Sequence, residues 1–372
     1  MKVMTIAGTR PEIIKLSCVI PELDRAFKHV LVHTGQNYDY ELNQIFFEGL
    51  GLRKPDHFLE AAGATAAQTI ANVIARADEV MAKEKPDALL LLGDTNSTLA
   101  AIAAKRRKIP IFHMEAGNRS FDERVPEELN RRIVDHTSDI NLVYTEHARR
   151  YLLAEGIRAE TVIKTGSPMK QVLAAQKKKI DASKILATLK LQKNRYFAVS
   201  LHREENVDDK ARFTRLLDAL SQLKEQHKAR VIVSTHPRTR KRLEALGKKA
   251  PKGLQFIAPL AFADYVHLQR AALCVLSDSG TLTEEASLLG FAAVMIREAH
   301  ERPEGMDQGT LIMAGTRPEA ILDAVNVATE RFARAGRTWR VAPDYDVDDV
   351  AAIVVNAILG YTDYINRTVW RK

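Results

Sequence analysis

The sequence contains little of what marks several protein classes. It has 2 cysteines in 372 residues, Cys18 and Cys274, and both lie in apolar surroundings, which favours buried thiols over a disulfide or a metal pair. No uninterrupted apolar run is long enough to span a bilayer. The start, MKVMTIAGTRPE, shows no basic segment, apolar core and small-residue cleavage site. We therefore expect a cytoplasmic protein that crosses no membrane.

Aromatic residues make up 6% of the chain, and no basic stripe is interleaved with them, which argues against nucleic-acid binding. The formal net charge is +8, and much of the excess is scattered, as in residues 105–108 and 176–184. Solvated helix faces are therefore the favoured interpretation. A basic surface also suits a polyanionic partner, and an anionic small molecule would need only a few of these cations.

Short apolar and β-branched runs alternate with helical patterns along the chain. Continuous apolar runs that end in Gly, Thr, Asp or His indicate parallel strands buried on both faces. The strands predicted in this way are residues 3–8, 29–35, 88–94, 110–117, 140–145 and 161–166, followed by residues 196–202, 230–236, 254–260, 273–280, 292–298 and 309–315. A polar, lysine-rich stretch separates the two series.

Two consecutive series of strands and helices predict the α/β class, with two doubly wound domains and a cleft between them. We expect the first domain over residues 1–167 and the second over residues 168–356. The helical tail, from about 357 to 372, is expected to pack back onto the first domain. Ligands of open parallel sheets bind beyond the carboxyl ends of the strands, and the polar residues considered next nearly all follow such ends.

Three carboxylates follow apolar runs in the first half of the chain. Glu115 in HMEAGNR and Glu127 in RVPEELNRR lie close together, and Asp94 ends ALLLLGD. This pattern is typical of a proton-transfer site. Acids in a first helical turn often only complement the helix dipole, and we prefer that interpretation for Glu128. Glu127 and Arg131 share a helical face, either as a surface salt bridge or as a pair directed into the cleft.

Two strand-to-helix turns are suited to anions. In GTRPEIIK, a capping box of Thr9 and Glu12 leaves Arg10 and Lys15 unexplained, and we favour Arg10 as an anion contact.

In SDSGTLTEE, Ser279, Gly280 and Thr281 bring backbone N–H groups and hydroxyls to a helix start, an arrangement that cradles a phosphate. The alternative is a capping box of Thr281 with Glu284, and both can hold. Glu285, about one turn further on, is placed to bind the two hydroxyls of a ribose.

His202 and His236 each end a predicted strand of the second series, where a histidine can transfer a proton or hold a phosphate. A structural, hydrogen-bonded role is the alternative. Asp94, His113, Glu115 and these histidines show no metal-ligand spacing such as HExxH, so we expect no metal. GxGxxG is absent, so a nicotinamide cofactor has no support.

The ordered motifs GTRPEIIK, HTGQNYDYE, GDTNSTLA, HMEAGNR, PEELNRR, SLHREEN, THPRTR, SDSGTLTEEA and ERPEG resemble those of the non-hydrolysing UDP-N-acetylglucosamine 2-epimerases, from Val3 to about Gly315. The resemblance implies a GT-B fold, with UDP held mainly by the second of two Rossmann-like domains. It implies elimination of UDP after removal of the proton at carbon 2, a 2-acetamidoglycal intermediate, and re-addition of UDP after protonation on the opposite face. It implies no metal or redox cofactor.

The resemblance also implies roles for individual residues. The catalytic residues implied are Asp94, Glu115 and Glu127, supported by Lys15, Arg131 and His202. The UDP-binding residues implied are Arg10, Ser279, Gly280, Glu285 and His236, with Tyr265 in the place of a uracil-stacking aromatic.

Three departures from the family pattern stand out. Gln36, Asn37 and Tyr38 replace a QHR-type segment, which puts activation by a second UDP-GlcNAc in doubt, while Glu204 and Thr281 replace an Arg and a Gly. HTGQNYDYELN, HMEAGNRSFDERVPEE, REAHERPEG and YTDYINRTVWRK are similar to a sub-branch that makes UDP-N-acetyl-L-fucosamine from its L-talo epimer for surface polysaccharide.

We therefore expect a UDP-sugar 2-epimerase of that sub-branch, which forms a homodimer and binds neither nucleic acid nor membrane. The alternatives are a UDP-GlcNAc/UDP-ManNAc 2-epimerase, a GT-B glycosyltransferase that needs an acceptor, and a UDP-sugar sensor without catalysis. The three carboxylates argue against the sensor, because binding a diphosphate sugar does not need three acids.

Overall fold

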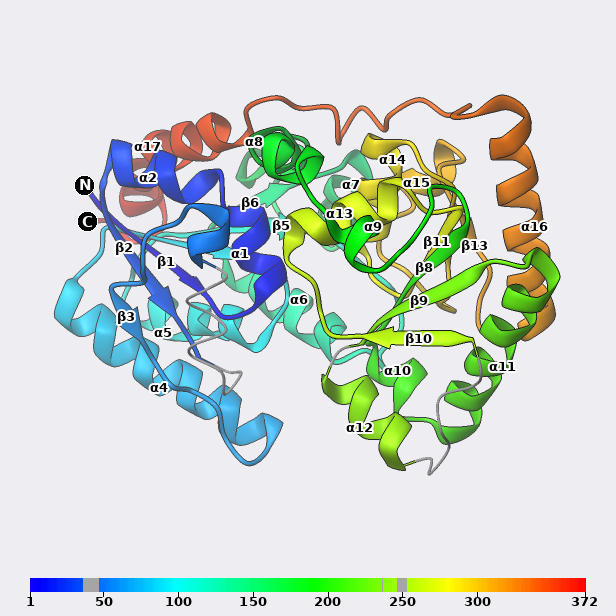
Figure 1. Ribbon diagram of the computed structural model, residues 1–372. Helices are drawn as coiled ribbons and strands as arrows, with labels where there is room; N and C mark the ends of the chain where they lie inside the picture. The colour runs from blue at the N-terminus through cyan, green and yellow to red at the C-terminus, as the bar shows by residue number, and fades with distance from the viewer. Residues whose placement is uncertain (36–46, 236, 246–252) are drawn as a thin grey trace. The chain divides into compact units, whose positions relative to one another are not determined.

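The computed structural model describes residues 1–35, 47–235, 237–245 and 253–372, which form two compact units. Unit 1 comprises Met1–Ala175 and Pro343–Lys372, and unit 2 comprises Gln176–Ala342 (Figure 1). The sequence-based domain limits at 167/168 and 356/357 stay a prediction. Among the described residues, no helix combines the length and apolar character needed to cross a membrane.

Unit 1 is built on a parallel sheet in the order β3-β2-β1-β4-β5-β6-β7. Its strands are β1 (Lys2–Ala7), β2 (Lys28–His33), β3 (His57–Phe58), β4 (Ala88–Leu92), β5 (Ile111–Ala116), β6 (Ile140–Val143) and β7 (Val162–Lys164). The six strands predicted in this region are confirmed. The two-residue β3 was not predicted.

The helices of unit 1 cover both faces of this sheet, with α2 and α17 on one side and α4 and α5 on the other (Figure 1). They are α1 (Arg10–Leu16), α2 (Val19–Ala26), α4 (Ala66–Glu84), α5 (Ala101–Arg106), α6 (Pro126–Thr137), α7 (Glu146–Ala154) and α17 (Val350–Thr368), with 3₁₀ turns η1 (Asn96–Ala100) and η2 (Ala159–Thr161). The tail helix α17 packs against α2. Helix α8 (Met169–Asp181) crosses the limit between the two units.

Unit 2 repeats the architecture with a parallel sheet in the order β10-β9-β8-β11-β12-β13. Its strands are β8 (Tyr196–Leu201), β9 (Arg230–Thr235), β10 (Leu254–Ile257), β11 (Cys274–Ser277), β12 (Ala293–Met295) and β13 (Ile312–Met313), each inside a predicted strand. Its helices are α9 (Ile185–Thr188), α10 (Glu204–Val207), α11 (Lys210–His227), α12 (Pro237–Ala245), α13 (Phe262–Arg270), α14 (Thr281–Leu289), α15 (Glu304–Asp307) and α16 (Pro318–Ala335).

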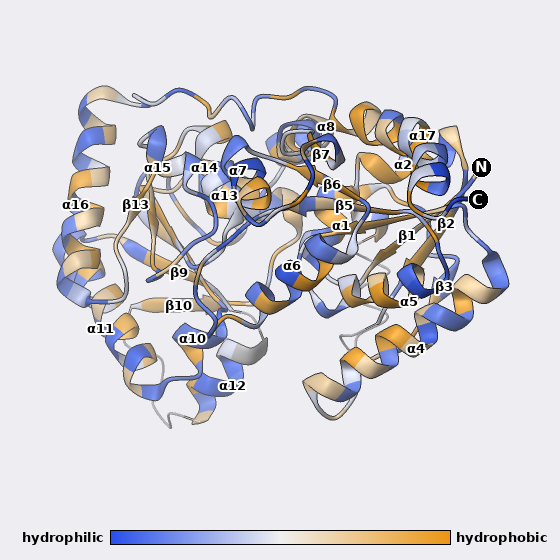
Figure 2. Cartoon of the chain, turned by 180° about the vertical axis from the view of Figure 1, so that it is seen from behind, coloured by the Kyte–Doolittle hydropathy of each residue, from blue (hydrophilic) through white to orange (hydrophobic). Residues whose placement is uncertain are grey.

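The long helices are amphipathic because one face of each packs on a sheet. Along α4 the buried positions are Thr69, Val73, Ala77 and Met81, which recur every four residues on one helical face. Figure 2 shows hydrophilic and hydrophobic residues alternating along α4 and α16. The central strands are buried along nearly their whole length, as predicted for parallel strands covered on both faces.

Both sheets are doubly wound. The strands are added first on one side of the unit's first strand and then on its other side, so the strand order reverses beside that strand. The reversal lies between β1 and β4 in unit 1, and between β8 and β11 in unit 2. Ligands of such sheets bind beyond the carboxyl ends of the strands at this point. The fold therefore selects the turns after these four strands for inspection.

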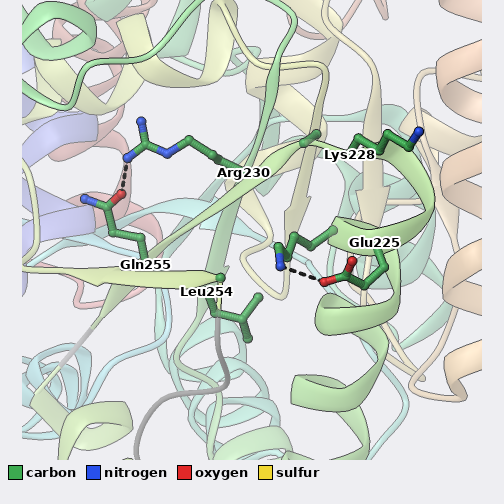
Figure 3. A pocket seen from close by; sticks show the side chains of 8 residues that line it. Glu225, Lys228, Arg230, Leu254 and Gln255 are labelled. Atoms are coloured by element: carbon green, nitrogen blue, oxygen red, sulfur yellow. Dashed lines mark hydrogen bonds and ion pairs between the residues drawn. The ribbon is translucent and has the colours of Figure 1, made fainter.

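A surface hollow of unit 2 lies at the other end of its sheet. It is lined by residues at the end of α11 and at the amino ends of β9 and β10, among them Lys224, Arg230 and Leu254. Arg230 bonds to Gln255, and Lys224 bonds to Glu225 at 2.6 Å (Figure 3). Its position away from the carboxyl ends of the strands separates it from the candidate site.

Candidate active site

The turn after β1 is held by the buried carboxylate of Glu12. Glu12 is 2% exposed and accepts hydrogen bonds from Gly8 N–H at 3.1 Å and from the Thr9 hydroxyl at 2.7 Å. The Thr95 hydroxyl, in the turn after β4, donates to the same carboxylate at 3.1 Å. The Thr9 side chain makes no cap bond to the helix, so only the carboxylate half of the predicted capping box is present. Glu12 therefore joins the two turns at the reversal point of the sheet.

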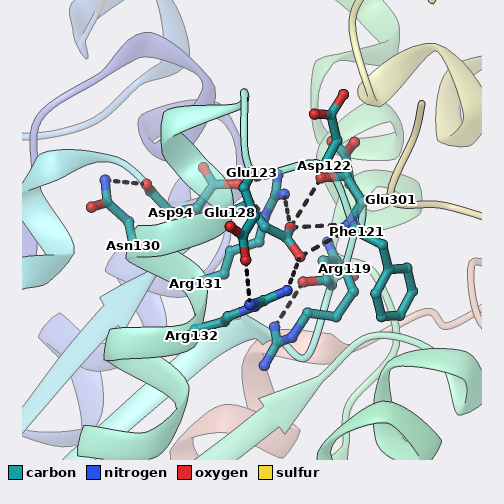
Figure 4. Close-up of polar contacts among 12 residues, drawn as sticks. Asp94, Arg119, Phe121, Asp122, Glu123, Glu128, Asn130, Arg131, Arg132 and Glu301 are labelled. Carbon is teal, nitrogen blue, oxygen red and sulfur yellow. Dashed lines mark hydrogen bonds and ion pairs between the residues drawn. The ribbon is translucent and has the colours of Figure 1, made fainter. Parts of the chain in front are cut away.

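Asp94, in the turn after β4, is paired with Arg131 of α6 (Figure 4). Arg131 Nε donates to Asp94 Oδ2 at 2.8 Å, and Nη2 lies 2.6 Å from the same oxygen. Asn130 holds the Asp94 backbone carbonyl at 3.0 Å. Because the Arg131 side chain is 3% exposed, the alternative of a surface salt bridge for this arginine is wrong.

Glu128 has a larger part in this region than the dipole complement we preferred. It is 1% exposed and accepts from the Ser120 N–H and hydroxyl, both at 3.0 Å, and from Arg131 Nη1 at 3.0 Å. Burial alone would raise the pKa of Glu128, but these donors and the charge of Arg131 bring the pKa below its usual value. Glu128 therefore links the loop after β5 to the arginine that binds Asp94 (Figure 4).

Glu115 lies at the end of β5 in an unusual backbone conformation. Its φ is 62°, in the left-handed region, and the register between β5 and β6 shifts between Met114 and Ala116. Such a conformation costs about 1–3 kcal/mol in a non-glycine residue and clusters at functional sites. The carboxylate contacts Lys15 Nζ from α1, and the two side chains are 10% and 5% exposed. The structure thus brings together two residues that the sequence predicted separately.

The other predicted residues of unit 1 lie in first helical turns. Glu127 is half-buried in the first turn of α6, and Arg10 is the exposed first residue of α1. Asp94, Glu115, Lys15 and Arg131 form two cation–carboxylate pairs beyond the carboxyl ends of neighbouring strands.

In unit 2, His202 follows β8 and is oriented by Asp278, which follows the neighbouring strand β11. The ring nitrogen Nδ1 lies 2.9 Å from Asp278 Oδ1, and the backbone N–H groups of His202 and Arg203 each donate to Oδ2 at 3.0 Å. Asp278 is 0% exposed. Burial alone would raise the pKa of Asp278, but the charge of His202 and these hydrogen bonds lower it to about 2.

Ser279 and Gly280 lead from β11 into α14. The N-cap of α14 is Gly280, which has no side chain to cap the helix, and Glu284 pairs with Arg302 at 3.1 Å. The alternative capping box of Thr281 and Glu284 is therefore wrong, because the helix begins one residue too early for it. A Cβ on Gly280 would lie 2.6 Å from Glu301 Oε1, so only glycine fits this turn without a shift.

Glu285 and Tyr265 lie near this turn. Glu285 is 7% exposed and accepts from Gln269 Nε2 at 2.6 Å. Tyr265, on α13, is half-buried and hydrogen-bonds to the Ser200 side chain. Burial raises the pKa of the Tyr265 hydroxyl, and the charges of Glu285 and Asp278 raise it further.

Two sets of residues singled out in the sequence, His236 and Gln36 to Tyr38, lie outside the described residues. Within the part of the chain that the structure describes, no group of three or more His, Cys, Asp or Glu side chains is arranged to hold a metal ion. Cys18 and Cys274 are free thiols, the first half-buried and the second buried.

Sequence reasoning missed the positions of Glu128 and Asp278. Glu128 and Arg131 are three apart, a spacing that pairs side chains on a helix as readily as the four-residue spacing we used. Asp278 could have been found only from the strand order, because it lies far from His202 in the chain and next to it in the sheet.

Known proteins match this chain over nearly its whole length. The profile of the family described as UDP-N-acetylglucosamine 2-epimerase matches residues 21–359. The structure of UDP-N-acetylglucosamine 2-epimerase from Rickettsia bellii has 55% sequence identity and a TM-score of 0.93, and the match covers 100% of both chains.

Two further proteins are similar over most of their length. The Methanocaldococcus jannaschii UDP-GlcNAc 2-epimerase, solved in complex with UDP-GlcNAc and UDP, has 33% identity and a TM-score of 0.90, and the match covers 97% of this chain and 100% of that chain. The UDP-2,3-diacetamido-2,3-dideoxy-D-glucuronate 2-epimerase of Pseudomonas aeruginosa is 35% identical over 88% of this chain and 92% of its own.

The predicted GT-B fold is confirmed by these structural neighbours, and the two parallel sheets are those of GT-B-type epimerases. The chain belongs to the UDP-N-acetylglucosamine 2-epimerase family, whose members are isomerases.

Proposed function

We propose that the chain inverts carbon 2 of a UDP-2-acetamido-2,6-dideoxy-L-hexose and forms UDP-N-acetyl-L-fucosamine for a surface polysaccharide. The observation that carries the reaction is the pair of cation-bound carboxylates, Glu115 with Lys15 and Asp94 with Arg131, beyond the carboxyl ends of neighbouring strands. Loss and return of a proton on opposite faces of one carbon needs more than one acid or base, and unit 1 supplies Asp94, Glu115 and Glu127.

The proposed reaction has two steps, an elimination of UDP and its re-addition. A carboxylate takes the proton from carbon 2, and the bond from carbon 1 to the diphosphate breaks with its electrons leaving on UDP. A 2-acetamidoglycal remains between the two steps. Protonation of carbon 2 on the opposite face and re-addition of UDP at carbon 1 complete the inversion.

We place the UDP on unit 2. The turn of Ser279 and Gly280 before α14 offers backbone N–H groups to the phosphates, and His202, oriented by Asp278, adds a donor that stabilises the departing diphosphate. Glu285 is the proposed ribose ligand and Tyr265 the proposed uracil contact. Arg10 and His236 are further proposed phosphate contacts.

The proposed sugar rests on the segments HMEAGNRSFDERVPEE and REAHERPEG, which are similar to the L-fucosamine sub-branch. One observation favours a second candidate, UDP-GlcNAc. The Rickettsia bellii protein, at 55% identity over the whole chain, carries the name UDP-N-acetylglucosamine 2-epimerase. The Pseudomonas aeruginosa relative acts by name on a different UDP-sugar at 35% identity, so membership of the family leaves the sugar open.

The test is NMR of each UDP-sugar with the enzyme in heavy water. We expect deuterium at carbon 2 of the product, with no acceptor added, and faster turnover of the 6-deoxy-L-sugar than of UDP-GlcNAc. Rapid turnover of UDP-GlcNAc alone would contradict the proposed sugar. No exchange with either substrate, or transfer that requires an acceptor, would contradict the epimerase reaction. The homodimer and the cytoplasmic location stay predictions, and light scattering of the purified protein tests the first.

A further inference from the structure

A cluster of buried charged side chains lies behind the carboxyl ends of β4 and β5. Its centre is Asp135 of α6, which is 0% exposed. Asp135 contacts His113 Nδ1 at 2.8 Å and accepts from Gly117 N–H at 3.1 Å and from Arg119 Nη1 at 2.7 Å. His113 and Arg119 are each 1% exposed. Any effect of this cluster on a reaction therefore passes through other residues.

Two contacts of the cluster end on the backbone beside the candidate acids. His113 Nε2 contacts the carbonyl oxygen of Gly93, the residue before Asp94, at 2.7 Å. Gly117, whose N–H is held by Asp135, is two residues beyond Glu115. Asp135 is thus connected, through His113, to the backbone next to Asp94 and, directly, to the backbone near Glu115.

His113 joins Asp135 to the backbone next to Asp94. A carbonyl oxygen only accepts, so His113 Nε2 donates to Gly93, and Nδ1 faces the Asp135 side chain. On the other side of Asp135, Arg119 pairs with both Asp135 and Glu155, each at 2.7 Å, so the buried arginine has partners of opposite sign.

We propose that Asp135 is a positioning residue that sets the directions of Asp94 and Glu115, through His113 and through Gly117. This inference rests on the proposed epimerase function. Glu115 adopts a positive φ that its own sequence does not favour, so the surrounding contacts must hold it there. The third proposed acid, Glu127, stands on the same helix as Asp135. Helix α6 thus carries Glu127 itself and, through Asp135, contacts the segments that carry Asp94 and Glu115.

The decisive variant is Asp135→Asn, which keeps the size of the side chain and removes its charge. We expect kcat to fall about 100-fold, the loss typical of a small misplacement of reacting groups, with KM and UDP affinity nearly unchanged. A crystal structure of this variant should show the backbone at Gly93 and Gly117 displaced. That structure tests the inference even if the wild type fails to exchange carbon 2 of any UDP-sugar, a result that would count against the function alone.

Asp139→Asn is the matched control. Asp139 is also buried, at 7% exposed, and accepts from Ile111 N–H at 2.9 Å, but this contact lies at the amino end of β5, away from the proposed acids. We expect it to lower stability and leave kcat intact. Equal losses of kcat in both variants, or normal kcat per UDP-binding site in Asp135→Asn, would overturn the inference.

A second pair of variants, at His113, tests the inference if Asp135→Asn does not fold. The amide of His113→Gln can still donate to the Gly93 carbonyl, whereas that of His113→Asn reaches only toward Asp135. We expect the Gln variant to retain at least about 10-fold more kcat than the Asn variant, because the Asn variant leaves the Gly93 carbonyl without this donor, and such a loss weakens an equilibrium by about that order. Equal activity of the two would refute the route through Gly93.

Discussion

The buried carboxylate of Glu12 allows a test of how its burial changes the pH dependence of the free energy of unfolding. Burial raises the pKa of Glu12 from 4.5 to about 7, although the backbone N–H groups of Gly8 and Thr9 and the hydroxyls of Thr9 and Thr95 donate hydrogen bonds to its carboxylate. Between these two pH values the folded protein holds a proton that the unfolded chain has released. The free energy of unfolding therefore falls as the pH rises from 4.5 to about 7, by about 3 kcal/mol, and stays lower above that range.

Glu12→Gln removes this titration and should stabilise unit 1 at high pH. The new amide oxygen can still accept from Gly8 N–H, and the Thr95 hydroxyl can turn to accept from the amide nitrogen. We expect the variant to be about 3 kcal/mol more stable than the wild type at pH 8, with the difference disappearing toward pH 4.5.

Urea unfolding from pH 5 to 8 measures the difference. The chain has 2 tryptophans, Trp339 in unit 2 and Trp370 in unit 1, so both proteins are studied with Trp339→Phe to make fluorescence report on unit 1. Glu79→Gln, exposed on α4, is the matched control and should show no such pH dependence. If the Glu12→Gln protein is less stable than the wild type at pH 8, the donors outweigh burial and the reasoning is refuted.

Three further predictions concern the proposed functional residues of unit 1 and of unit 2. The neutral variants of the three proposed acids are Asp94→Asn, Glu115→Gln and Glu127→Gln. Each should lower kcat by about 10²–10⁴-fold while UDP binding, measured by calorimetry, persists. Near-normal turnover of any one variant would remove that acid from the catalytic set. Gly280→Ala should weaken UDP affinity, because the new methyl group would lie 2.6 Å from Glu301 Oε1, and unchanged affinity would argue against UDP at this turn. Asp278→Asn should lose about 2 kcal/mol of unfolding free energy at pH 7, since the folded pKa of about 2 lies below the unfolded 3.8. That stabilisation is present above pH 3.8 and is lost as the pH falls through about 2, so the gap between the two proteins should narrow in acid unfolding curves.

The strands were predictable because each is a short apolar run buried on both faces, and such runs leave a clear local signal. β3 left none, because it has two residues, His57 and Phe58, and is only half-buried. The residues that follow strands were also predictable as a group. Parallel strands carry their carboxyl ends to one edge, so Asp94 and Glu115 were expected near one another.

The partners of these residues were less accessible. Local spacing related Glu127 to Arg131, yet Arg131 contacts Asp94 from a different element and Glu128 from its own helix. Lys15, on the helix that follows β1, reaches Glu115 at the end of β5 because only β4 separates these two strands in the sheet. Pairings of this kind depend on sheet order and side-chain direction, which the sequence pattern of any one segment does not contain.

The return of the chain to unit 1 has a consequence for its synthesis. Unit 1 is completed by Pro343–Lys372, whose helix α17 packs on α2 and whose last residue donates from Lys372 Nζ to the Lys108 carbonyl at 2.7 Å. All of unit 2 is therefore made before unit 1 has its full set of packing partners. While the ribosome is still translating the final helix, the hydrophobic face of α2 has no cover from α17, and a chain released early would expose this surface to chaperones and proteases.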